Sequence, residues 1–135
     1  MDGIILTSLR QIQNKKGNIF HALKKSDEGY CGFGEAYFSS VNLNETKGWK
    51  KHTKMTLNLV VIKGEIEFVI YDDSSKNFFN VRLSKNNYQR LTVLPNMWLA
   101  FKGIEQENIL LNIANVEHDP TEAINEHLSA FNYEW

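Results

Sequence analysis

Polar side chains occupy every second position of one stretch and could together carry acid–base chemistry: His52, Lys54, Thr56 and Asn58. On a β-strand, side chains two residues apart share a face. An imidazole could remove a proton from a carbon next to a carbonyl, an ammonium could stabilise the resulting oxyanion, and the hydroxyl and amide could orient a polyhydroxylated substrate. We therefore predict that this row faces a pocket. The alternation also fits a sheet with one solvated face, and that interpretation stays open.

A second polar row lies on the preceding candidate strand. Glu35, Tyr37 and Ser39 share one face, and Tyr37 could supply a phenolic acid to a pocket, although such alternation is also typical of a half-exposed strand. Lysines make the first half of the chain locally basic, at positions 24, 25, 47, 50 and 51. They would suit a diphosphate, or they belong to a solvated surface.

The histidines do not predict a metal site. His21, His118 and His127 have no metal-ligand spacing with one another or with Cys31. The ammonium of Lys54, two residues from His52, would repel a cation placed beside that imidazole. We predict no metal and no other cofactor.

These residues lie among short apolar runs that are separated by turn residues, a pattern typical of an all-β sandwich or barrel. The runs predict strands at Ile4–Gln11, Phe33–Val41, Thr53–Ile62, Glu65–Tyr71, Phe79–Leu83, Gln89–Val93, Trp98–Phe101 and Asn108–Asn115. Lys63 and Gly64 predict a hairpin connection. Near the end, Asp119, Pro120 and Glu122 form a capping-box pattern that predicts a short C-terminal helix.

Length and composition limit the class of protein. The 135 residues fit one domain, 1–135, and the formal net charge of −1 gives no global field for nucleic acid or an anionic membrane. No apolar stretch approaches the roughly 18 residues of a membrane span, and the start of the chain lacks a signal-like apolar region. With one cysteine, Cys31, we expect a cytoplasmic protein.

Several motifs occur in an order that covers most of the chain: Gly48-Trp49-Lys50-Lys51-His52, the strand from Gly64 to Asp72, the stretches Phe79 to Ser84 and Asn87 to Pro95, and His118-Asp119-Pro120. This order resembles the dTDP-4-dehydrorhamnose 3,5-epimerase family of cupins. That family has an Arg-Gly-Leu-His-Tyr-Gln-like motif, a Gly-Glu-Val strand ending in Asp, a Leu-Ser-x-x-Asn stretch before an apolar-Pro turn, and a late Asp-Pro.

The resemblance implies a cupin jelly roll (double-stranded β-helix), a homodimer with exchanged N-terminal strands, here Ile4–Gln11, and a metal-independent enzyme. Its substrate would be a deoxythymidine-diphosphate 4-keto-6-deoxy sugar. The family's catalytic histidine falls on His52, which would remove the proton α to the C4 ketone. Lys47 stands nearest to the family's substrate-binding arginine.

Three positions depart from the family pattern. The place of its tyrosine acid carries Leu111 or Asn112, an expected lysine meets Leu57 or Asn58, and the histidine after the proline turn meets Leu99. Single-centre epimerisation and keto-isomerisation therefore both stay open. We predict His52, Lys54 and Tyr37 as catalytic residues, and the predicted substrate-binding residues are Lys47, Lys51, Thr56, Asn58 and Asn112.

Two functions follow from these observations. The first is a sugar-nucleotide epimerase or isomerase that serves surface-polysaccharide precursor synthesis. Its binding partner would be a nucleotide-sugar substrate, and we expect it to bind neither nucleic acid nor a membrane. The alternative is a catalytically inactive cupin that binds a sugar or a sugar nucleotide.

Overall fold

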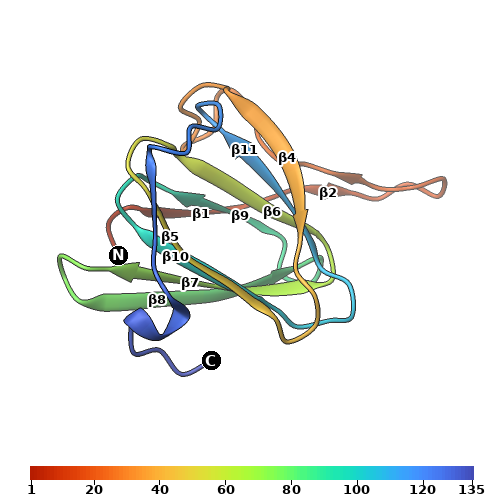
Figure 1. Ribbon diagram of the computed structural model, residues 1–135. Coiled ribbons are helices and arrows are strands. Elements are labelled where there is room, and N and C mark those ends of the chain that lie inside the picture. The colour runs from red at the N-terminus through yellow and green to blue at the C-terminus, as the bar shows by residue number, and fades with distance from the viewer.

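Two antiparallel β-sheets packed face to face form the body of the molecule in the computed structural model, which describes residues 1–135 (Figure 1). The first sheet has the order β1 (Ile4–Ser8), β9 (Gln89–Val93), β6 (Leu57–Lys63), β11 (Ile109–Ala114), β4 (Glu35–Ser40). The second has the order β12 (Ala123–Asn125), β5 (Thr46–His52), β10 (Trp98–Gly103), β7 (Glu65–Asp72), β8 (Asn77–Ser84). The predicted all-β jelly roll is confirmed.

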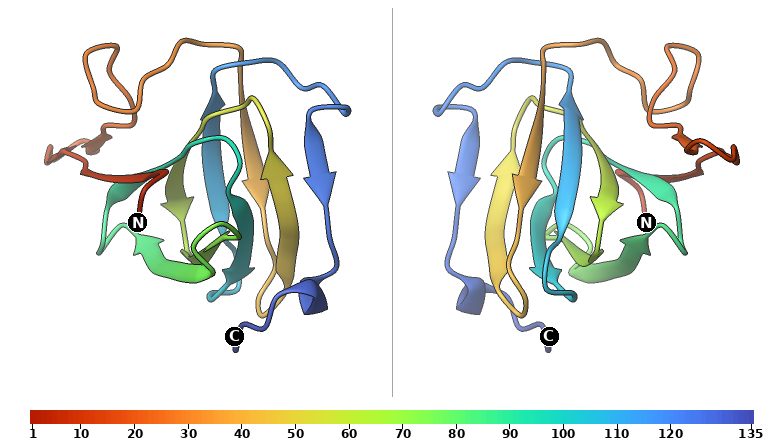
Figure 2. Two further views of the ribbon diagram at one scale, coloured as in Figure 1. Left: turned by 90° about the vertical axis from the view of Figure 1, so that its left-hand side faces the viewer. Right: turned by 90° about the vertical axis from the view of Figure 1, so that its right-hand side faces the viewer.

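Two small elements lie outside the sheets. The strands β2 (Gln11–Ile12) and β3 (Ile19–Phe20) pair only with each other, and their hairpin projects from the body as an arm (Figure 1). A 3₁₀ turn, η1 (Leu128–Ala130), follows β12. In Figure 2 the N-terminal arm and the C-terminal segment lie on opposite flanks of the molecule. The chain contains no helix with the length and apolar character of a membrane span.

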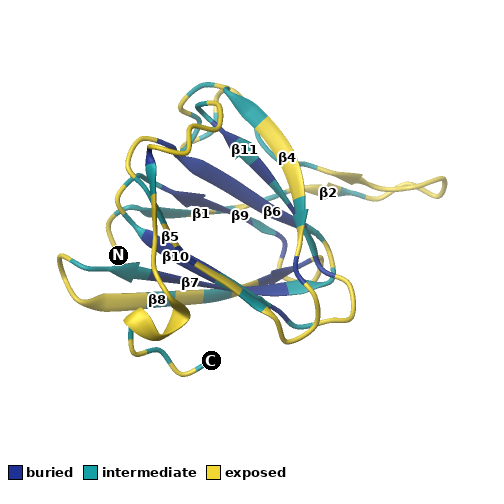
Figure 3. Cartoon of the chain, viewed as in Figure 1, coloured by how far each residue is buried: buried dark blue, intermediate teal, exposed yellow.

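The core between the sheets comes from alternating apolar residues, as the period of a strand requires. From β6 the inward residues are Leu57, Leu59 and Val61, and they join Phe68 and Leu91 in one buried cluster. Figure 3 shows β6 buried along almost its whole length, whereas β4 and the β2–β3 arm are largely exposed. The cavity described below lies toward the β4 side of this core.

The predicted hairpin at Lys63-Gly64 is wrong, because β6 and β7 belong to different sheets and do not pair. The two residues instead form the tight turn by which the chain passes from one sheet to the other. Gly64 has a φ of +74°, and a Cβ there would stand 2.1 Å from the backbone oxygen of Glu107. No side chain fits that space, so glycine is required at this turn.

The predicted C-terminal helix is wrong, because residues Ala123–Asn125 form β12 and pair with β5 instead. Asp119 accepts hydrogen bonds from the backbone and the hydroxyl of Thr121 in a local turn. Glu122 does not cap a helix, since its carboxylate is used by the chain that follows β5. Edge pairing with β5 therefore outweighs the local helix signal.

The predicted strand Thr53–Ile62 is also different in the structure. The chain forms one strand that ends at His52 and another that begins at Leu57, with a bend at Thr53 and Lys54 between them. Because the bend joins strands of opposite sheets, the alternation before it does not continue after it. The predicted row of four inward polar side chains is therefore interrupted after its first member.

Aromatic residues cover the outer face of the second sheet. Trp49 and Trp98 are buried there with Val69 and Ala100, and the C-terminal residues Phe131, Tyr133 and Trp135 pack against them. The indole of Trp49 donates a hydrogen bond to the backbone oxygen of Leu128 at 3.1 Å. The tail after β12 thus holds β5 from the side opposite to the cavity.

Candidate active site

A cavity of about 340 Å³ lies between the two sheets. It is lined by inward residues of both sheets: Tyr37, Ser39, Lys47, Gly48, Lys50, His52, Leu57, Leu59, Leu99, Phe101, Leu110, Asn112 and Asn125. The apolar members form its walls. The polar members come mainly from β4, an edge strand of the first sheet, and from β5, which lies between β12 and β10 in the second. A cavity of this kind, apolar with a few convergent polar groups, is typical of a small-molecule site.

His52 ends β5, and its ring is held by a buried carboxylate. The Nδ1 atom of His52 is paired with Oε1 of Glu122, and the side chain of Glu122 is only 3% exposed. The other oxygen, Oε2, accepts the backbone N–H groups of Thr53 and Lys54 at 3.0 Å and of Met55 at 3.3 Å. The bend after β5 therefore wraps around the Glu122 carboxylate.

This environment keeps Glu122 ionised. Burial alone would raise its pKa, but the hydrogen bonds from His52 and from the backbone of Lys54 and Met55 outweigh burial, and the net pKa is lowered. An ionised carboxylate can only accept, so Nδ1 of His52 carries a proton and donates it to Glu122. In the neutral ring, Nε2 then has a free lone pair and can act as a base.

Tyr37 and Asn112 meet across neighbouring strands of the first sheet, where they are partners in the β4–β11 register. The Nδ2 group of Asn112 donates to the hydroxyl oxygen of Tyr37 at 3.1 Å, and its Oδ1 accepts the backbone N–H of Asn58 at 3.2 Å. Asn112 is 1% exposed. The phenol of Tyr37 is thus brought to the cavity with a buried amide behind it.

The charged residues that line the cavity are all basic. Lys47 and Lys50 accompany His52 along the inner face of β5, and no aspartate or glutamate is among the lining residues. The Nζ atom of Lys47 donates to the backbone oxygen of Ser40 at 2.6 Å, which links β5 to the edge strand β4. Lys50 has no hydrogen bond or ion pair within the protein, so its ammonium is free to bind an anion.

Three predicted site residues lie elsewhere. Lys54 is exposed at the bend, Thr56 is buried where its backbone N–H donates to Asn115, and neither lines the cavity. Asn58 points to the outer face of the first sheet, because β6 begins with the inward residue Leu57. The prediction that these side chains share an inner face with His52 is wrong, and the reason is the bend that precedes β6.

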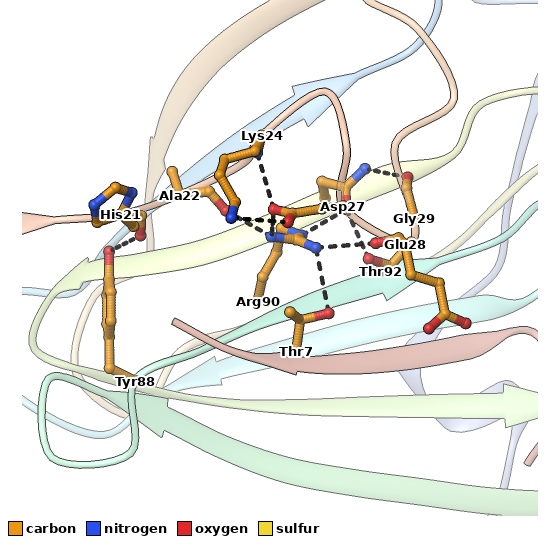
Figure 4. A network of polar contacts seen from close by, with 11 residues as sticks. Thr7, His21, Ala22, Lys24, Asp27, Glu28, Gly29, Tyr88, Arg90 and Thr92 are labelled. Carbon is orange, nitrogen blue, oxygen red and sulfur yellow. Dashed lines mark hydrogen bonds and ion pairs between the residues drawn. The ribbon is translucent and has the colours of Figure 1, made fainter. Parts of the chain in front are cut away.

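On that outer face, Asn58 accepts a hydrogen bond from Arg90 at 3.1 Å. Figure 4 shows the polar network around Arg90. Arg90 is fully buried, and it donates to Asn58, Asp27 and Thr7 and to the backbone oxygens of Ala22 and Glu28. These contacts fix the segment between β3 and β4 on the sheet. Asn58 of β6 and Arg90 and Thr92 of β9 are thus hydrogen-bonded to one another and stabilise this part of the fold.

Lys51 also faces away from the cavity. Its Nζ atom pairs with Asp73 at 2.7 Å and lies 5.0 Å from the centre of the Trp98 ring. The hydrogen bonds from Lys51 and Trp98 lower the pKa of Asp73. Lys51, predicted to bind substrate, therefore belongs to the outer aromatic face and does not line the cavity.

Of the predicted residues, the structure brings together His52, Tyr37, Lys47 and Asn112 around one cavity, together with Ser39. Sequence reasoning missed Glu122, Asn125 and the specific place of Lys50. A strand ending at His52 would have put Lys50 on the same face as the histidine, but no local signal connects Glu122 with a residue 70 positions earlier. No group of three or more His, Cys, Asp or Glu residues could hold a metal ion.

The chain matches one protein family and is similar in fold to several solved structures. Residues 2–134 match the family described as FdtA: WxcM-like, C-terminal, whereas no curated protein matches the sequence significantly. The crystal structure of a dTDP sugar isomerase from Desulfovibrio desulfuricans G20 has a TM-score of 0.93 and 29% identity, and the match covers 99% of this chain and 91% of that one.

Two further structures share the fold at lower identity. QdtA, a sugar 3,4-ketoisomerase from Thermoanaerobacterium thermosaccharolyticum in complex with TDP, has a TM-score of 0.81 and 19% identity, over 92% of this chain and 88% of that one. The 3,5-epimerase RmlC from Legionella pneumophila, in complex with dTDP-4-keto-L-rhamnose, has a TM-score of 0.83 and 14% identity, over 95% and 74%.

These likenesses confirm the cupin jelly roll that the motif order implied. The family match spans all but the first and last residues of the chain. The protein therefore belongs to the FdtA family, the WxcM-like C-terminal domains.

Proposed function

We propose that the protein is a nucleotide-sugar ketoisomerase, which moves the ketone of a nucleoside-diphosphate 4-keto-6-deoxy sugar between C4 and C3. The observation that carries this proposal is His52, oriented by the buried Glu122, in a cavity whose lining charges are all basic. The dTDP sugar isomerase with 29% identity and the 3,4-ketoisomerase QdtA support the substrate class.

The reaction needs one base for the carbon-bound proton. Nε2 of His52 takes the hydrogen from C3, which the neighbouring C4 ketone makes acidic, and the electron pair moves into an enediolate. The imidazolium exchanges this proton with solvent and then delivers a proton to C4. The C3 hydroxyl proton moves to the oxygen on C4, so C3 becomes the ketone and C4 the alcohol, and no atom is gained or lost.

The negative charge that develops on the C4 oxygen must be stabilised by a hydrogen-bond donor or a cation. The hydroxyl of Tyr37 and the free ammonium of Lys50 both line the cavity and would stabilise this oxyanion, while Lys47 at the β4 edge would face the diphosphate. Lys50 takes the role that the sequence pattern assigned to Lys54. The diphosphate then neutralises basic side chains that have no acidic partner inside the cavity.

Asn112 favours ketoisomerisation over double epimerisation. Inversion of a carbon requires a donor on the face opposite to the base, and the resemblance places such an acid, a tyrosine, at Leu111 or Asn112. Of these two, Asn112 lines the cavity, and an amide cannot deliver a proton to carbon near neutral pH. A single imidazole can serve two adjacent carbons on one face.

Product analysis in D₂O tests this function directly. Incubation with dTDP-4-keto-6-deoxyglucose is expected to move the carbonyl signal in the carbon NMR spectrum to C3 and to place solvent deuterium at C4. Deuterium at C3 or C5 with the ketone still at C4 would make the protein an epimerase. Binding of dTDP-sugars without any exchange would support the inactive binding protein.

We further propose that residues 1–135 act as one domain in a homodimer. Because β1 pairs with β9 of its own chain, the proposed contact between the two copies uses the projecting β2–β3 arm instead of an exchanged β1. The projecting β2–β3 arm carries Ile19, 56% exposed, and Phe20, 37% exposed. Apolar side chains on a projecting arm gain burial when a second copy covers them. Light scattering that gives the mass of one 15.6 kDa chain at micromolar concentration would contradict the dimer.

The place of the reaction in the cell follows from the proposed substrate. We propose a cytoplasmic enzyme that supplies a keto sugar nucleotide for surface-polysaccharide precursors, which fits its exposed free cysteine, Cys31. Fractionation of cells that express the tagged protein checks the location.

A further inference from the structure

The hydrogen bond between Asn112 and Tyr37 has a direction, and the direction determines what Tyr37 can do. The amide of Asn112 is buried, and its Oδ1 accepts the backbone N–H of Asn58. The reverse amide orientation would set an NH₂ group against that N–H, donor against donor. The network therefore fixes Nδ2 as the atom that faces Tyr37.

Tyr37 must then accept from Asn112 and cannot donate to it. The phenolic oxygen receives the Nδ2–H bond, and the hydroxyl of Tyr37 has no other hydrogen bond within the protein. Its own proton is left without a protein acceptor at the wall of the cavity. From this geometry we infer that Asn112 is a positioning residue, which makes Tyr37 an obligatory hydrogen-bond donor toward the substrate oxygen.

This inference rests on the proposed function and deepens it. The sugar oxygen on C4 gains negative charge in the enediolate, and a phenol whose hydrogen is already free can donate to that oxygen without first breaking a bond to the protein. The side chains of Leu57, Leu59 and Leu110 line the cavity and contain no acceptor. Ser39 and Asn125 line it as well, but neither is hydrogen-bonded to the hydroxyl of Tyr37. A hydroxyl committed to an acceptor on β11 would lose this advantage.

The variant Asn112→Asp reverses the bond while keeping its shape. One carboxylate oxygen can still accept the backbone N–H of Asn58, but the other can only accept, so Tyr37 must turn its proton to the carboxylate and away from the substrate. We expect kcat to fall about 100-fold, within the range of a lost general acid, and binding of dTDP to change by less than about 3-fold. The variant Asn77→Asp, at the exposed start of β8, adds the same charge outside the cavity and serves as the control.

Two further variants separate direction from packing. Asn112→Ala removes the bond and leaves a void but frees the hydroxyl of Tyr37, so we expect it to retain more kcat than Asn112→Asp. A purely structural role predicts the opposite order, because alanine leaves the backbone N–H of Asn58 without its partner and the isosteric aspartate does not. Thermal unfolding of each variant shows whether the fold is retained.

The double-mutant cycle with Tyr37→Phe completes the test. In the Tyr37→Phe background, Asn112→Asp is expected to lower kcat by less than about 3-fold, because the donor that it misdirects is already gone. An equal loss in both backgrounds, or an alanine variant slower than the aspartate variant, overturns the positioning role and leaves the proposed function intact. A wild-type protein that leaves 4-keto dTDP-sugars unchanged overturns both.

Discussion

Two polar clusters lie on opposite faces of the first sheet. We call a cluster closed when its donors and acceptors are all paired within the protein, and open when some are left without a protein partner. Around Arg90 the cluster is closed, because every N–H group of the guanidinium reaches a protein acceptor (Figure 4). In the cavity, by contrast, Lys50 has no partner, the hydroxyl proton of Tyr37 has no acceptor, and Nε2 of His52 is free.

The difference separates a structural cluster from a functional one. A buried polar group costs free energy unless it is paired, so a closed network contributes rigidity and a unique fold. Groups that stay open at a cavity wall are available for a ligand. The predictions below test this separation, by asking which cluster changes turnover and which changes stability when it is altered.

The largest effect on turnover is expected from His52→Asn. Asparagine retains a polar side chain but cannot cycle a proton near neutral pH, so deuterium exchange into the 4-keto sugar should fall by about 10²–10⁴-fold. Binding of the nucleotide, measured by calorimetry, should change little, because the loss concerns the transition state. Exchange at the wild-type rate would exclude His52 as the base.

The largest effect on stability is expected from Arg90→Met in the closed cluster. The change leaves Asp27 and the oxygens of the loop before β4 without their buried partner, which typically costs about 3–5 kcal/mol. Denaturant unfolding measures it. A loss below about 1 kcal/mol would mean that the loop does not depend on Arg90.

Glu122→Gln should lower turnover by a smaller factor, about 10–100-fold, because the base is still present but is no longer held by a carboxylate. The amide would also set a donor against either His52 or the backbone of the bend. Steady-state kinetics measure the change in kcat, and an unchanged kcat would show that Glu122 does not orient the ring.

The same carboxylate predicts a pH dependence of stability. The pKa of Glu122 is lowered in the folded protein from an ordinary value of 4.5, so the folded state binds its proton less readily than the unfolded state. Its contribution to stability is present above about pH 4.5 and is lost as the pH falls through the lower folded pKa. The stability difference between wild type and Glu122→Gln should therefore shrink on acidification, as urea titrations at several pH values can show.

The smallest effects are expected at two adjacent lysines, Lys50 and Lys51, whose substitutions should differ clearly in their effect on kcat/KM. Lys50→Met removes an open cation from the cavity and should weaken kcat/KM for the dTDP-sugar by about 10-fold. Lys51→Met removes a partly exposed ion pair with Asp73, which is worth about 0–1 kcal/mol, and should leave kcat/KM within about 2-fold of wild type. An equal loss in both variants would place Lys51 at the substrate after all.

Much of the fold was determined by the sequence itself. The alternation in the strands, the glycine at the β6–β7 turn and the order of the motifs predicted an all-β jelly roll, with His52 as its catalytic residue. The structure and the family match confirm the fold. Strand periodicity and turn chemistry are local properties, so they can be read without knowing which strands pair.

The composition of the site was decided only by the tertiary structure. The bend after His52 moved Asn58 to the outer face, where Arg90 binds it, and the pairing of β12 with β5 replaced the expected helix and brought Glu122 to His52. Both events depend on contacts between residues far apart in the chain, and such contacts decide which side of a strand is enclosed and which side chains complete a site. These long-range contacts cannot be predicted from the sequence pattern within one segment.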